Sequence, residues 1–85
     1  MVIVNQDKDE IVNFDRADSI WVCSDEDGRF TIEATADTNT TLGCYKTKER
    51  AKEVLKEIVN KYRQCNLDNN KAVTIIPKVY EMPKE

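Results

Sequence analysis

The chain has 85 residues, 40% of them hydrophobic, and a formal net charge of −3. This size predicts one domain, residues 1–85, whose single small core leaves little room for a deep private pocket. No histidine is present and no apolar run approaches the roughly 18 residues that span a bilayer, so we expect no enzyme, no metal or cofactor site and no membrane span.

Two short strands at 2–4 and 11–14 begin the predicted elements, and polar turns follow them at 5–10 and 15–18. Residues 19–24, with the sequence SIWVCS, then carry apolar side chains on both faces. A strand that is apolar on both faces is typical of the centre of a sheet. We therefore predict that 19–24 is a central strand.

Residues 25–28, with the sequence DEDG, predict a hairpin turn in which the glycine supplies a positive φ. The strand 29–36 follows, and its apolar and polar side chains alternate, as expected when one face of an antiparallel sheet meets solvent. After a short turn, 40–45 is predicted as a further strand. Its inward-facing side chains would be Leu42 and Cys44.

A long amphipathic helix is predicted from the N-cap Thr47 to Gln64. Its apolar side chains recur at a spacing of three and four residues, which places them in one stripe: Ala51, Val54, Leu55, Ile58, Val59 and Tyr62. We expect a polar loop at 66–70 after the helix. The stripe requires a sheet beneath it.

The last extended segment, 72–82, contains Pro77, which cannot donate a ladder hydrogen bond, so we expect an edge strand. Both faces of this segment are apolar, and one helix can bury only one of them. The other face, with Ile76, Tyr80 and Met82 as candidate interface residues, would be covered by another subunit of a homo-oligomer or lie across a sheet edge. The predicted fold is thus α+β: an antiparallel β-sheet, a meander of about five strands, packed by one long amphipathic helix, plus a C-terminal edge strand.

Basic side chains crowd the predicted start of the helix, where the helix dipole is already positive. Free backbone N–H groups and these cations would suit a bound anion, such as a nucleotide phosphate or an acidic protein surface. The alternative is that the lysines are only solvated. The candidate anion-binding residues are Tyr45, Lys46, Lys48, Arg50 and Lys52.

Charge is distributed unevenly along the chain. Residues 1–45 carry ten acidic and three basic side chains, a balance of −7, whereas 46–85 carry six acidic and ten basic ones, a balance of +4. This polarity fits an oppositely charged partner or a neighbouring copy, or simply a solvated surface. Neither half is basic enough for duplex nucleic acid. The three cysteines lack paired spacing and fit reduced thiols in a cytoplasm.

Three segments, VNQDKDEIVNF, LGCYKTKERAKEVLKEI and KVYEMPKE, together resemble a family of small uncharacterised proteins of phages and prophages of Gram-positive bacteria. The resemblance implies a non-enzymatic accessory protein in the host cell cytoplasm. Such a protein would act in counter-defence, by sequestering a small anionic or nucleotide ligand or by occluding a host defence protein. The alternative is a structural or assembly component of a phage particle or replication complex. The resemblance implies no catalytic or binding residue.

Overall fold

The computed structural model describes residues 1–68 and 79–85, and the side chains of all of these except 65–68. The described elements are, in chain order, β1 (Val2–Val4), β2 (Ile11–Asn13), the 3-10 helix η1 (Phe14–Arg16), β3 (Ser19–Ser24), β4 (Phe30–Ala36), β5 (Thr38–Tyr45), α1 (Lys48–Asp68) and β6 (Val79–Glu81). The α+β class predicted from the sequence is confirmed.

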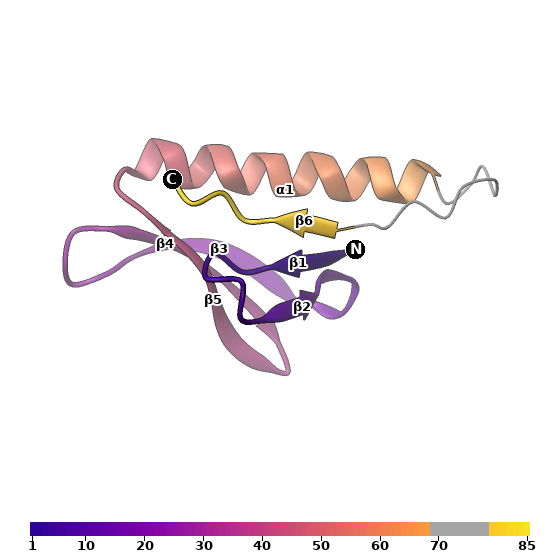
Figure 1. The fold of residues 1–85 in the computed structure, drawn as a ribbon, viewed down its shortest axis with the longest axis horizontal. Coiled ribbons are helices and arrows are strands. Elements are labelled where there is room, and N and C mark those ends of the chain that lie inside the picture. Colours follow the sequence, from indigo (N-terminus) through magenta and orange to yellow (C-terminus); the bar gives the residue numbers. More distant parts are fainter. Residues whose placement is uncertain (69–78) are drawn as a thin grey trace.

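The strands form two separate sheets, where the sequence predicted one meander of about five strands. One sheet has the order β3-β4-β5 and is an antiparallel meander; the other has the order β2-β1-β6. In the second sheet β1 pairs antiparallel with β2 but parallel with β6, with Ile3 opposite Tyr80. Figure 1 shows α1 lying along the molecule, with β6 running between this helix and β1. The prediction of a C-terminal edge strand is confirmed for Val79–Glu81, and residues 72–78 of the predicted segment lie outside the described residues.

The prediction that 19–24 is a central strand is wrong, because β3 forms an edge of its sheet. Ile20 and Val22 are half-buried against the core, and Trp21 on the other face is also half-buried. Apolar side chains on both faces are therefore compatible with an edge strand whose two faces are each partly buried. The order of apolar and polar residues along a strand does not distinguish such an edge strand from a central one.

The helix begins as predicted, because Thr47 caps it: the Arg50 amide donates to Thr47 Oγ1 at 3.1 Å. It continues to Asp68, beyond the predicted end at Gln64, since residues 65–68 contain neither glycine nor proline. Ala51, Val54 and Ile58 are fully buried, whereas Val59 at the margin of the stripe is 36% exposed. Within the described residues, no helix has the length and apolar character to cross a membrane.

A β-bulge changes the face of β5 that meets the core. Ile32 pairs with Gly43, but the next residue, Glu33, pairs with Thr41, so Leu42 is the extra residue. Beyond the bulge the alternation is reversed. Leu42 is buried as predicted, but Tyr45 rather than Cys44 enters the core, and Cys44 stays half-exposed. A bulge leaves no clear mark in an alternating sequence, which explains the error.

The two sheets and the helix share one hydrophobic core. Its fully buried members include Ile3 from β1, Ile32 from β4 and Ile58 from α1. At its far end the rings of Phe14 and Tyr62 meet edge to face, with centroids 5.0 Å apart. Gly43 lies where the sheets meet: a Cβ there would come within 2.9 Å of Tyr45 Oη and 3.2 Å of Met82 Cε. A larger residue at this joint would force Tyr45 or Met82 to shift.

Candidate functional site

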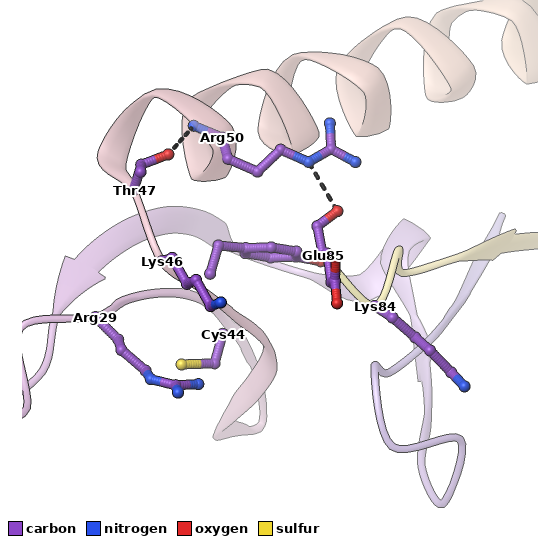
Figure 2. Close-up of a pocket in the computed structure, with 8 residues that line it drawn as sticks. Arg29, Cys44, Lys46, Thr47, Arg50, Lys84 and Glu85 are labelled. Carbon is purple, nitrogen blue, oxygen red and sulfur yellow. Dashed lines mark hydrogen bonds between the residues drawn. The ribbon is translucent and has the colours of Figure 1, made fainter.

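A cavity of about 340 Å³ opens between the end of β5, the first turn of α1 and the segment 84–85. Four of its lining side chains are cationic. Its lining consists of Arg29, Cys44, Tyr45, Lys46, Thr47, Arg50, Lys84 and Glu85. In the view of Figure 2, Arg29 and Lys46 lie on the same side of the cavity, Arg50 lies on the helix above them, and the Lys84 side chain points away. Arg29 and Lys46 are both exposed.

The register of the meander brings Arg29 and Lys46 to the same cavity. Phe30, the first residue of β4, pairs with Tyr45, the last residue of β5, so Arg29 just before β4 and Lys46 just after β5 lie at the same end of the meander. The hairpin turn fixes the position of Arg29, because Asp25 Oδ1 accepts from both the Asp27 and the Arg29 amides at 2.9 Å. The Cys44 thiol lies nearby, 4.0 Å from Asp25 Oδ2.

Arg50 is the most constrained cation of the cavity. Its Nη1 lies 2.6 Å from Glu53 Oε1 and 4.0 Å from Glu57 Oε1, and its Nε donates to the Glu85 carbonyl at 2.9 Å. These contacts neutralise most of its charge and fix residue 85 against the helix. Within the described residues, Arg29, Lys46 and Lys84 have no carboxylate within 4.0 Å. Because the Lys84 side chain points away, the positive charge of the cavity comes chiefly from Arg29 and Lys46, and Glu85 adds one carboxylate to the lining.

Gln6 joins parts of the cavity wall that lie far apart in the sequence. Its Nε2 donates to the carbonyls of Cys44, Pro83 and Lys84, and its Oε1 accepts from the Cys44 amide at 2.8 Å. The Gln6 amide also donates to the Leu42 carbonyl. One side chain therefore joins the loop after β1, the end of β5 and the segment after β6. Gln6 was not among the residues predicted for the site, because its role depends on hydrogen bonds to residues that lie 38 to 78 positions away along the chain.

Tyr45 lines the cavity with a ring that belongs to the core. Only 2% of the residue is exposed, and its hydroxyl donates to the Pro83 carbonyl at 2.8 Å. Burial raises the pKa of this hydroxyl to about 12, chiefly by desolvation. Tyr45 is thus a structural support beneath the cavity, with its only hydroxyl already engaged.

The structure brings together some, but not all, of the residues predicted for the anion site. Lys46 and Arg50 line the cavity together with Tyr45, whereas Lys48 and Lys52 are exposed and lie outside the lining. Arg29 and Lys84 were missed. Arg29 could not be placed near Lys46 from the sequence, because the register of β4 with β5 depends on the bulge at Leu42. Lys84 required knowledge of the parallel pairing between β1 and β6.

The three candidate interface residues have different environments. Met82 is 3% exposed and packs in the chain's own core. Tyr80 is half-buried, and its hydroxyl donates to Glu57 Oε2 at 2.9 Å; burial, with that hydrogen bond, raises its pKa. Ile76 lies outside the described residues. The apolar side chain that β6 exposes is that of Val79, which is 40% exposed.

A second hollow, of about 360 Å³, lies between β2 and the turn that joins β4 to β5. Its lining includes one cation, Arg16, and two acidic residues, Glu10 and Asp37. This charge balance does not favour an anion. In the part of the chain that the structure describes, no three side chains gather with the chemistry of a metal site.

The first cavity therefore combines two cations without a carboxylate partner among the described residues, Arg29 and Lys46, with the positive end of a helix. This arrangement can hold a small anion by charge and by backbone N–H groups. Comparison of the chain with protein-family models, with curated proteins and with solved structures gives no match.

Proposed function

We propose that this chain is a non-catalytic binding protein that holds a small anionic ligand in the cavity between β5, α1 and residues 84–85. The observation that supports this most directly is that Arg29 and Lys46 both line the cavity and have no carboxylate partner within 4.0 Å among the described residues. Cations that line one cavity repel each other, and a bound anion relieves that repulsion.

The start of α1 adds to the attraction. The first N–H groups of a helix have no acceptor within the helix, and Thr47 satisfies only the Arg50 amide. A cation at this end of a helix is unfavourable by a few tenths of a kcal/mol, and an anion is favourable by about 0.3–1 kcal/mol. Backbone donors and side-chain cations therefore favour the same ligand, one that carries a phosphate.

The size of the cavity, about 340 Å³, falls at the lower end of the range for small-molecule sites. A nucleotide is therefore a suitable ligand. Binding without catalysis is supported by the composition of the chain, since a sequence without histidine lacks the commonest general base. The resemblance to phage proteins extends the proposal: such a protein would act in a host cytoplasm by sequestering a nucleotide signal.

Isothermal titration calorimetry at low salt tests the proposal, with inorganic phosphate, adenosine monophosphate and a cyclic dinucleotide as the titrants. Low ionic strength is needed because exposed charges are screened over about 10 Å at 0.1 M salt. We expect the nucleotides to bind, and we expect Arg29→Glu and Lys46→Glu each to weaken binding about tenfold or more.

Lys48→Glu and Lys52→Glu are matched controls, because they make the same change of charge close to the cavity, at the start of α1, but outside the lining. They should lower the affinity by a factor of about three or less, through long-range charge alone. Equal losses in all four variants would show that only overall charge matters, and absence of heat with every titrant would refute the ligand proposal.

A further inference from the structure

Strand β3 is an edge strand without the features that normally protect one. Edge strands are usually short, charged, bulged, interrupted by proline or covered by other backbone. The six residues of β3, SIWVCS, include no charge and no proline, and the pairing with β4 runs without a bulge from Ser19 to Ser24. Such a strand can accept a further strand through its free N–H and C=O groups.

The other three edges of the two sheets are protected. In the part of the chain that the structure describes, β2 and β6 have only three residues each. The longer β5 is covered over part of its free edge, since Gln6 takes up the Leu42 carbonyl and both backbone groups of Cys44. β3 is therefore the edge on which an extended segment has the most room.

The hairpin turn determines which backbone groups of β3 are free. The Asp25 amide donates to the Arg29 carbonyl, and bonded and non-bonded pairs alternate along an antiparallel ladder. Residues 19, 21 and 23 are therefore bonded to β4. Ile20, Val22 and Ser24 direct their N–H and C=O groups outward, and within the described residues no backbone partner reaches them.

The ends of this edge are acidic. Exposed Asp18 stands before the strand, and Asp25, Glu26 and Asp27, all exposed, follow it. None of these four has a basic side chain within 4.0 Å among the described residues. A partner strand would therefore be favoured by basic residues at both of its ends.

The same charges argue against a second copy of this chain. Two β3 strands paired antiparallel about a two-fold axis at Val22 would place Asp18 opposite Glu26 of the other copy, and this would occur twice. Like charges directly opposite one another destabilise a sheet. A polyanion such as nucleic acid is disfavoured by the same four carboxylates.

We propose that the β3 edge binds an extended segment of another protein, about six residues long, whose β-branched and apolar residues are flanked on both sides by lysine or arginine. The segment adds a fourth strand to the β3-β4-β5 sheet. The backbone groups of Ile20, Val22 and Ser24 form the ladder, and the acidic ends select the flanks.

Trp21 is the only tryptophan of the chain and lies in the middle of β3, so its fluorescence should report binding of a peptide to this edge. The probes are a synthetic peptide KKTVTVTVKK and its counterpart EETVTVTVEE, each titrated to about 1 mM, a range suited to weak strand addition. We expect the lysine-flanked peptide to shift the Trp21 emission and to slow amide exchange at Ile20, Val22 and Ser24. It should bind about tenfold more tightly than the glutamate-flanked peptide.

Two variants keep the test decisive. Ser24→Pro removes one outward N–H from an exposed position, whereas Ser24→Ala keeps it; we expect the proline variant alone to lose binding, about tenfold. If the proline variant does not fold, the double variant Asp18→Lys, Glu26→Lys brings the four flanking charges from −4 to zero and should abolish the preference for the lysine-flanked peptide that the wild type shows. Equal binding of the two peptides to the wild type, unchanged exchange at the three amides, or self-association through β3 would each overturn the proposal.

Discussion

The two sheets of this protein are built from contacts of different range. In β3-β4-β5 the strands are six, seven and eight residues long and follow one another through short turns. In β2-β1-β6 each strand has three residues, and the parallel partner of Val2 is Val79. Short strands that pair across most of the chain gain few hydrogen bonds for the chain entropy that their pairing costs. Their attachment therefore depends on side chains at the joint.

The candidate anion site lies at this joint. Arg29 and Lys46 belong to the meander, whereas Lys84 and Glu85 follow β6. The wall from the meander is fixed by local pairing, and the other wall is fixed by hydrogen bonds from Gln6, Tyr45 and Arg50. Changes at the joint should therefore affect the cavity before they affect the meander.

The largest expected effect tests whether the sheets share one core. Ile3 and Ile32 are both fully buried, one in each sheet, so Ile3→Ala and Ile32→Ala should each lower the free energy of unfolding by about 3–4 kcal/mol. Chemical denaturation followed by circular dichroism should show one transition in both cases. If Ile3→Ala unfolded the β2-β1-β6 sheet and left the meander intact, the two sheets would not share one core.

A smaller loss, about 2 kcal/mol, is expected for Gly43→Ala, because the new methyl group meets Tyr45 Oη and Met82 Cε within 3.2 Å. The same change in a Tyr45→Phe background should cost less, because the nearest atom, Tyr45 Oη, is gone while Cε2 at 3.1 Å remains. Thermal unfolding of the four proteins of this cycle measures the difference. Equal costs in both backgrounds would show that the Tyr45 hydroxyl is not the obstacle.

Gln6→Ala should show the difference between the two sheets most clearly, because it should affect the β2-β1-β6 sheet more than the meander. It removes the hydrogen bonds to Cys44, Pro83 and Lys84 at a cost of about 1–2 kcal/mol. Amide exchange should become faster at Met82, whose N–H donates to Val4, and remain unchanged in β4. Gln64→Ala, on the exposed side of α1, is the control; similar exchange in both variants would exclude a specific role for Gln6.

The smallest effect is a dependence on alkaline pH. The Tyr45 hydroxyl ionises near pH 10 in an unfolded chain, but in the folded protein burial raises its pKa to about 12. The unfolded state therefore releases its proton first, and stability falls as the pH rises from 10 to 12. Between pH 10 and 11 the wild type should lose about 1 kcal/mol more than Tyr45→Phe. Parallel denaturation curves would contradict this linkage.

Some features of the fold and the site could be predicted because neighbouring residues decide them. The cap at Thr47, the buried face of α1 at Val54 and Ile58, and the alternation of β4 all follow from local spacing. Lys46 and Arg50 could be placed near the start of the helix for the same reason. The positions of Gln6 and Lys84 could not, since each depends on a partner far away along the chain.

The sequence by itself determined the α+β class, the long helix and the meander hairpins, because periods of 2 and 3.6 residues record which side of each element is apolar. Only the tertiary structure decided the parallel closure of β6 on β1, the bulge at Leu42 and the edge position of β3. These depend on how one small core is filled by side chains from all parts of the chain. Burial of Tyr45 and Met82 against Gly43 selected that arrangement, and no local pattern specifies it.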